Sequence, residues 1–203
     1  MGDLWRKEKS NRPKKSNFWV KWGYVLFVEK ERIILKSIYI HTERPEDTFQ
    51  VGAVIGQTLP AGSVVCLYGD LGAGKTKLTQ GIGSGLGVKE PINSPTFTLI
   101  NLYQGRLPLY HLDLYRLVEP EELEELGWED YIYGEGIAVI EWPEKLHGQL
   151  PASYLKIRLD QMETATEEQR QLIIEGIGRA GSELMHLILA NLAVLKNIKI
   201  STR

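Results

Sequence analysis

One eight-residue run combines closely spaced glycines with a lysine and a threonine. Residues 69–76 read Gly-Asp-Leu-Gly-Ala-Gly-Lys-Thr, a full match to the Gly-x4-Gly-Lys-Thr pattern of a phosphate-binding loop. In such a loop the glycines let backbone N–H groups converge on phosphate oxygens at the N-terminus of a helix. The lysine bridges the β- and γ-phosphates, and the threonine hydroxyl binds Mg²⁺. We therefore predict a nucleotide site formed by Gly72, Ala73, Gly74, Lys75 and Thr76.

Two acids further along the chain each end a run that suits a strand. Asp113 ends Leu-Tyr-His-Leu-Asp, and Glu141 ends Ile-Ala-Val-Ile-Glu. A nucleotide site needs a carboxylate at the end of a neighbouring strand, where it holds the metal ion and polarises water. Either residue can also be an ordinary carboxylate at a strand end. We predict that Asp113 and Glu141 both act in catalysis together with Lys75.

Two further side chains between the loop and Glu141 are candidates for the same site. Thr96, in Ser-Pro-Thr-Phe, could sense a γ-phosphate as the hydroxyls of switch loops do, although this sequence is also typical of a turn that enters a strand. His111 could act as a base, but a lone histidine on a strand more often has a structural hydrogen-bonding role. We include Thr96 among the catalytic candidates and leave both interpretations of His111 open.

The choice of nucleotide follows from patterns that the sequence lacks. It has no Asn-Lys-x-Asp run, which reads guanine, so we favour ATP over GTP. It also lacks the His-Arg-Asp and Asp-Phe-Gly motifs of protein kinases. The expected ligands are therefore ATP and Mg²⁺.

Strands and helices around the loop must hold these residues in place. Residues 64–68 form a short apolar run that suits a strand buried on both faces, and residues 75–86 are expected to form a helix. Upstream, Thr48 or Asp47 is expected to cap a helix that runs to Leu59. The loop then connects a buried strand to a helix, which is the context that its motif requires.

The remaining pattern predicts an α/β fold. Strands are expected at 97–103 and 107–114, joined as a hairpin, and at 137–140, 154–159 and 169–174; helices are expected at 120–126 and 182–195. Buried strands that alternate with helices favour three layers. We predict a three-layer P-loop NTPase fold with a mostly parallel central sheet and an added antiparallel hairpin.

Composition limits the class of protein. A hydrophobic fraction of 43% is enough for a packed core, and a formal net charge of −2 is not that of a dedicated nucleic-acid binder. The single cysteine, Cys66, cannot form an internal disulfide and fits a reducing compartment. Because no apolar run approaches the roughly 20 residues of a membrane span, we expect a cytoplasmic protein without membrane contact.

Charge is unevenly distributed along the chain. Residues 1–40 contain ten Lys or Arg and four acids, a net charge of +6, so the other residues carry −8. We predict a basic N-terminal extension at 1–40, which is a solvated tail, an effect of a start placed too far upstream, or an RNA-binding arm, and a P-loop ATPase domain at 41–203. Any contact with tRNA is expected to be weak or indirect.

Five motifs in order resemble the bacterial TsaE (YjeE) family. They are the loop at 69–76, Ser-Pro-Thr-Phe-Thr-Leu at 94–99, His-Leu-Asp-Leu-Tyr-Arg-Leu at 111–117, Pro-Glu-Glu-Leu-Glu at 120–124 and Glu-Trp-Pro-Glu at 141–144. The resemblance runs from about residue 42 to about 189. It implies a small P-loop ATPase that works with the TsaD and TsaB proteins to form threonylcarbamoyladenosine at position 37 of tRNAs that read ANN codons. In that scheme a TsaC-type enzyme supplies the adenylate, TsaD transfers it, and ATP hydrolysis resets the TsaD-TsaB complex between turnovers.

The resemblance also implies roles for individual residues. Glu141 would bind or position Mg²⁺ together with Thr76, and Asp113 and Thr96 would line the γ-phosphate side. Trp142 would belong to the same site. The implied nucleotide contacts outside the loop are Thr48 and Arg170 near the base or ribose and Lys77 near the α-phosphate. The chain departs from the family pattern at Lys77, where a second Thr or Ser is common, and before Arg170, where a glycine is expected.

Two other functions fit a P-loop protein of this size. A small-molecule kinase would transfer the γ-phosphate to a metabolite, but it would usually show an arginine-rich lid, and arginines after the loop are sparse. An ATP-gated adaptor would use nucleotide binding to order its loops, without essential hydrolysis.

Overall fold

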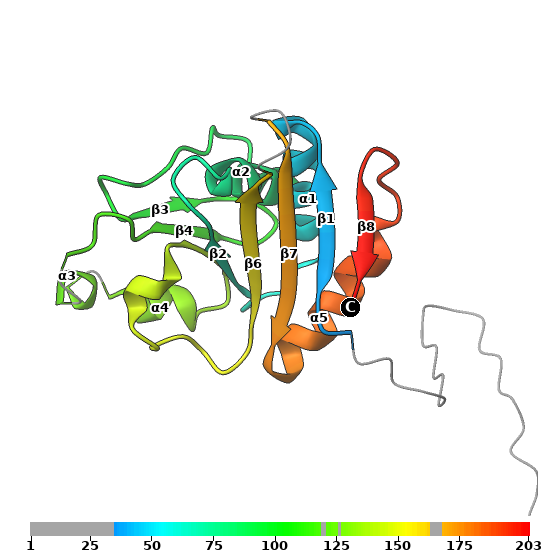
Figure 1. The fold of residues 1–203 in the computed structure, drawn as a ribbon. Coiled ribbons are helices and arrows are strands. Elements are labelled where there is room, and N and C mark those ends of the chain that lie inside the picture. Colours follow the sequence, from blue (N-terminus) through cyan, green and yellow to red (C-terminus); the bar gives the residue numbers. More distant parts are fainter. Residues whose placement is uncertain (1–34, 119–120, 126, 163–167) are drawn as a thin grey trace, which may run out of the picture. The chain divides into compact units, whose positions relative to one another are not determined.

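The computed structural model describes residues 35–118, 121–125, 127–162 and 168–203. Its described residues form one eight-stranded sheet with the strand order β3-β4-β5-β2-β6-β7-β1-β8 (Figure 1). The strands are β1 (Ile38–Thr42), β2 (Val64–Tyr68), β3 (Ile100–Tyr103), β4 (Leu109–Asp113), β5 (Ile137–Glu141), β6 (Tyr154–Gln161), β7 (Arg170–Ile177) and β8 (Lys199–Thr202).

The centre of the sheet is parallel and both of its edges are antiparallel. β4, β5, β2 and β6 run parallel to one another, and β3 pairs antiparallel with β4 as the predicted hairpin. At the other edge β7, β1 and β8 are antiparallel as well, so the antiparallel part extends beyond that hairpin. The predicted α/β fold with a parallel centre is confirmed, and β8 is an addition that its short, half-polar sequence did not indicate.

Helices cover both faces of this sheet. α1 (Pro45–Thr58), α2 (Lys75–Gly85) and α5 (Gly178–Leu192) supply one hydrophobic core, whose sheet side includes Val65, Leu67 and Val139. α3 (Glu121–Glu124), α4 (Trp128–Ile132) and the 3₁₀ helix η1 (Pro143–Leu146) belong to the opposite side, where the second core includes Cys66 and Ile140. Alternate residues of β2 and β5 thus point to different cores, which gives the predicted three layers. Burial raises the pKa of the Cys66 thiol, which is a core group.

The glycines within α2 explain how it packs on α1. A Cβ on Gly81 would lie 2.1 Å from the carbonyl oxygen of Phe49, and one on Gly85 would lie 2.1 Å from that of Ala53. On the facing helix, a Cβ on Gly56 would lie 2.1 Å from the carbonyl oxygen of Ile82. Glycine weakens a helix by up to ~1 kcal/mol relative to alanine. Here its absence of a side chain lets the two backbones meet closely, and this close approach positions the N-terminus of α2.

The start of α1 differs from the prediction. The helix begins at Pro45 with Arg44 as its N-cap residue, so neither Thr48 nor Asp47 caps it. Asp47 is the third helical residue, and its carboxylate accepts hydrogen bonds from the backbone N–H of Arg44 at 3.0 Å and from its guanidinium at 3.2 Å. A proline fits the first helical position because its missing N–H would have no partner there. That preference outweighs the capping preference of the later residues.

The described part of the chain enters the sheet before residue 40. β1 begins at Ile38, which is fully buried, and Leu35 belongs to the same core. Ser37 and Arg203 also exchange backbone hydrogen bonds in both directions, at 3.1 Å each. The expected boundary at about residue 40 therefore passes through β1, and a truncation should begin at Leu35.

A chain that begins at Leu35 is expected to fold and bind ATP like the full chain, whereas a chain that begins at Ile40 is expected to be unstable. The shorter chain loses the buried Leu35 and Ile38 side chains, which costs about 3 to 6 kcal/mol. That loss corresponds to a fall in Tm of roughly 10 °C or more for a chain of this size. Thermal unfolding followed by circular dichroism measures it, and ATP binding at low and near-physiological salt shows whether residues 1–34 contribute electrostatically. Equal Tm values for the two truncations would contradict the boundary.

No helix among the described residues is both long and apolar enough to cross a membrane.

Candidate functional site

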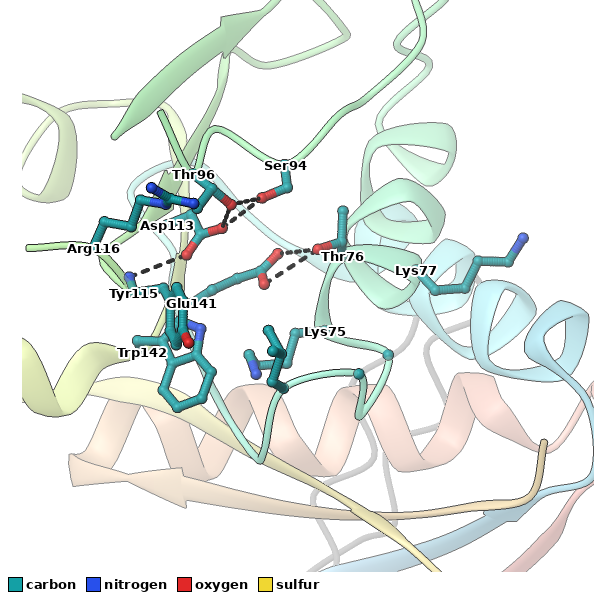
Figure 2. A pocket seen from close by; sticks show the side chains of 13 residues that line it. Lys75, Thr76, Lys77, Ser94, Thr96, Asp113, Tyr115, Arg116, Glu141 and Trp142 are labelled. Carbon is teal, nitrogen blue, oxygen red and sulfur yellow. Dashed lines mark hydrogen bonds between the residues drawn. The ribbon is translucent and has the colours of Figure 1, made fainter. Parts of the chain in front are cut away.

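The parallel strands bring the predicted residues together at one edge of the sheet. In the register of β4, β5 and β2, Asp113 lies beside Glu141 and Glu141 lies beside Leu67, one residue before the end of β2. The loop that follows β2 therefore starts next to both acids. A cavity of about 620 Å³ opens there (Figure 2). Its lining comprises Leu71, Gly72, Gly74, Lys75, Thr76, Lys77, Ser94, Thr96, Asp113, Tyr115, Arg116, Glu141 and Trp142.

The glycine-rich loop has backbone conformations that only glycine adopts without strain. Gly69 has φ +138°, and a Cβ there would lie 2.3 Å from the carbonyl oxygen of Leu159. Gly74 is the N-cap residue of α2 with φ +101°. The first N–H groups of a helix have no partner within it, so α2 presents donors and the positive end of its dipole at this loop. The loop is built to receive an anion.

Lys75 is held within the loop. Its Nζ donates hydrogen bonds to the carbonyl oxygens of Gly69 at 2.6 Å and Asp70 at 2.9 Å, and lies 3.9 Å from the centre of the Trp142 ring. Burial lowers the pKa of the ammonium, and the carboxylates of Glu141 and Asp113 partly offset this effect. An ammonium has three N–H groups, so one remains beyond these two bonds for a phosphate oxygen.

Thr76 and Glu141 supply oxygens at a spacing that fits a magnesium ion. The Thr76 hydroxyl donates to Glu141, with Oγ1 3.0 Å from Oε1 and 3.3 Å from Oε2. Two oxygens at adjacent positions of an octahedron around Mg²⁺ lie about 3.0 Å apart. The described residues contain no cluster of three or more His, Cys, Asp or Glu that could hold an ion. Two protein ligands are enough when nucleotide phosphates and water complete the shell.

His111 forms a hydrogen bond with the Glu141 carboxylate from outside the cavity. It is fully buried, and its Nε2 lies 2.8 Å from Glu141 Oε1. Because a carboxylate accepts hydrogen bonds, we assign the proton to Nε2. Nδ1 has no hydrogen-bond partner among the described residues, which fits an unprotonated nitrogen. His111 does not line the cavity, so its geometry favours the structural interpretation over the base.

Asp113 gathers two hydroxyls on the other side of the cavity. Its Oδ2 accepts hydrogen bonds from Ser94 Oγ at 2.5 Å and from Thr96 Oγ1 at 2.6 Å, and its Oδ1 accepts one from the backbone N–H of Tyr115 at 3.2 Å (Figure 2). The segment that carries Thr96 is thus fixed to the end of β4. The sequence analysis missed Ser94, although its place two residues before Thr96 was the available signal.

Aromatic and cationic side chains complete the cavity wall. The Trp142 ring packs on Tyr115 with their centres 5.1 Å apart. Arg116 lines the cavity, and its guanidinium lies 4.4 Å from the centre of the exposed Phe97 ring. The sequence analysis did not single out Tyr115 and Arg116. They follow Asp113 in the same motif, so proximity to an acid at a strand end was the signal.

The family model described as threonylcarbamoyl adenosine biosynthesis protein TsaE matches residues 42–172, which is more than half of the chain. The chain belongs to the TsaE family. The match runs from the last residue of β1 to the start of β7 and includes every residue of the site described above.

Individual relatives agree with this assignment. The tRNA threonylcarbamoyladenosine biosynthesis protein TsaE of Nostoc sp. is 55% identical over 119 residues, which cover 56% of this chain and 72% of that protein. The protein of the same name from Bacillus subtilis is 38% identical over 145 residues, which cover 71% and 89%. The crystal structure of Bacillus subtilis YdiB superposes with a TM-score of 0.66 at 31% identity, covering 77% of this chain and 96% of that one.

The TsaE resemblance implied three nucleotide-binding residues outside the phosphate-binding loop, and these residues lie together. Thr48, Lys77 and Arg170 line a small cavity of about 40 Å³ with Gly74. The Thr48 hydroxyl is buried and lies 2.9 Å from Thr42 Oγ1. Lys77 lies 3.9 Å from a carboxylate oxygen of Glu46. Their contacts with base, ribose or α-phosphate stay predictions.

Proposed function

We propose that this member of the TsaE family hydrolyses ATP with Mg²⁺ at the edge of the sheet where β2, β4 and β5 end. The observation that carries the proposal is the convergence of Lys75, Thr76 and Glu141 on one cavity, with Thr76 Oγ1 3.0 Å from Glu141 Oε1. Family membership supports it, since this site lies within the matched residues.

Each side chain has a separate task in this proposal. The loop N–H groups and Lys75 bind the β- and γ-phosphates, and Thr76 and Glu141 hold the metal ion. When bound, Mg²⁺ neutralises the charge that develops between the β- and γ-phosphates. Asp113 and Thr96 face the γ-phosphate and orient a water molecule. The water oxygen bonds to the γ-phosphorus and the bond from that phosphorus to the bridging oxygen breaks, so that ADP leaves with the bridging oxygen. The Asp113 carboxylate accepts the proton of the water and passes it on to the phosphate product.

We further propose that the hydrolysis serves threonylcarbamoyladenosine formation in tRNA, with the TsaD-TsaB complex as partner in the cytoplasm. The relatives from Nostoc and Bacillus are named for this pathway. The net charge of −8 after residue 40 favours a protein partner over direct tRNA binding, because phosphate contacts need clustered cations. In this scheme ATP hydrolysis resets the complex between rounds and does not itself modify the tRNA.

Reconstitution with purified proteins tests this function. TsaD, TsaB and tRNA are incubated with preformed threonylcarbamoyl adenylate, so that adenylate formation consumes no ATP in the assay, and modified nucleoside per TsaD is measured with and without this protein. We expect more than one turnover only when this protein and ATP are both present. Turnover that needs this protein but is equally supported by a non-hydrolysable ATP analogue would favour the ATP-gated adaptor. Phosphate transfer to a metabolite, without stimulation of TsaD, would favour the kinase.

A further inference from the structure

Arg170 reaches the phosphate-binding loop from a distant strand. It is the first residue of β7, where it pairs with Gln161 of β6 and Thr42 of β1. β6 also lies beside β2. The carbonyl oxygen of Leu159 on β6 is so close to the first residue of the loop that a Cβ on Gly69 would clash with it. The start of β7 therefore lies at the same edge of the sheet as the loop.

The guanidinium of Arg170 binds the loop through backbone carbonyls. Nε donates to the carbonyl oxygen of Ala73 at 2.9 Å, and Nη2 donates to that of Gly72 at 3.2 Å. Nη1 donates to the carbonyl oxygen of Gln169 at 2.9 Å, which anchors the guanidinium to its own strand. Two adjacent peptide groups of the loop are thus held by one planar side chain, whose fork of donors has a fixed geometry.

Holding these carbonyls fixes the direction of the N–H groups. In a planar trans peptide the N–H points opposite to the C=O. With the Ala73 carbonyl on Arg170, the N–H of Gly74 points away from the arginine, and Gly74 also lines the larger cavity. The N–H of Ala73 donates to the Asp70 carbonyl oxygen at 3.1 Å and closes the turn. A glycine-rich loop without this restraint could rotate a peptide so that a carbonyl oxygen, not an N–H, faces the phosphates.

We propose that Arg170 is a positioning residue of the phosphate-binding loop, which acts on the binding of the phosphates and not of the base or ribose. The proposal rests on the proposed nucleotide site. It differs from the role that the family resemblance implied, because two of the guanidinium hydrogen bonds end on the loop itself.

Binding of two ligands that share only their phosphates tests the proposal. The Kd values of ADP and of inorganic pyrophosphate, each with Mg²⁺, are measured by calorimetry for the full chain and for R170A and R170K. We expect R170A to weaken both ligands by the same factor, about 10-fold or more, since two charge-assisted hydrogen bonds to the loop are lost. R170K keeps the charge but loses the fork, so we expect it to bind nearly as weakly as R170A.

R158A is the matched control, because Arg158 on neighbouring β6 also donates from its guanidinium, with Nε shared between the two oxygens of the half-buried Asp160 carboxylate and, among the described residues, no bond to the loop. Binding is measured at a temperature at which circular dichroism shows every variant to be folded. If Arg170 contributed only to the stability of the fold, the Kd values at that temperature would be unchanged. Weaker ADP binding with unchanged pyrophosphate binding would mean a base or ribose contact and overturn the proposal, as would full binding by R170A or R170K. Absence of ADP and pyrophosphate binding by the unmodified chain would instead contradict the nucleotide site itself.

Discussion

Replacing Lys75 by alanine is expected to reduce ATP hydrolysis by about 10²- to 10³-fold, or about 3 to 4 kcal/mol of transition-state stabilisation. Its ammonium is the cation that the loop holds in place, through bonds of 2.6 Å and 2.9 Å to the carbonyls of Gly69 and Asp70. Those two bonds hold the ammonium at the loop, where we propose that the phosphates bind. Phosphate release at saturating ATP and Mg²⁺ measures the effect.

The control for this variant is K156A. Lys156 is also a lysine, but it lies on β6, pairs with Glu175 at 2.9 Å and does not line the large cavity. We expect K156A to hydrolyse ATP at the rate of the unmodified chain. The Trp142 ring that packs on Lys75 also remains in K75A, so the shape of the cavity wall is preserved. Unchanged turnover in K75A would show that hydrolysis does not use this loop.

The parts of the site that sequence predicted are those encoded by neighbouring residues. The loop at 69–76 combines a strand end, glycines at positive φ and a helix start within one short segment, so its structure follows from local preferences. The buried runs before Asp113 and Glu141 indicated strands, and parallel strands end at the same edge. The register that sets Asp113 beside Glu141 depends on the packing of the whole sheet and could not be derived from the separate runs.

The parts that sequence analysis missed depend on contacts between distant segments. The bond from His111 to Glu141 joins residues 30 positions apart, and the bond from Arg170 to Ala73 joins residues 97 apart. Glycines weaken a helix in isolation, and the use of the α2 glycines in packing on α1 appears only when both helices are placed. β1 was not expected as a strand because it is short and follows a strongly basic segment.

Replacing Glu141 by alanine is expected to leave ADP binding within about threefold of the unmodified chain while hydrolysis falls by about 10²-fold or more. In the proposed function the phosphates are bound mainly by the loop N–H groups and Lys75, which this variant retains. The lost carboxylate accepts the hydrogen bond from Thr76 Oγ1 at 3.0 Å and is the second protein ligand of the metal ion in the proposed function. Calorimetry with Mg²⁺ and ADP and the rate of phosphate release separate the two effects.

The Mg²⁺ dependence makes this prediction specific to the metal. If Glu141 holds the ion, the concentration of Mg²⁺ that half-saturates hydrolysis should rise in E141A, because Thr76 alone would remain as the protein ligand. E129A, at an exposed acid on α4, is the matched control and should keep both the rate and the Mg²⁺ dependence. D113A removes the acceptor of the Ser94 and Thr96 hydroxyls and leaves the Thr76–Glu141 pair, so its half-saturating Mg²⁺ concentration should be unchanged even where its rate is lower. Full ATPase activity in both E141A and D113A would remove the assignment of catalysis to these two carboxylates.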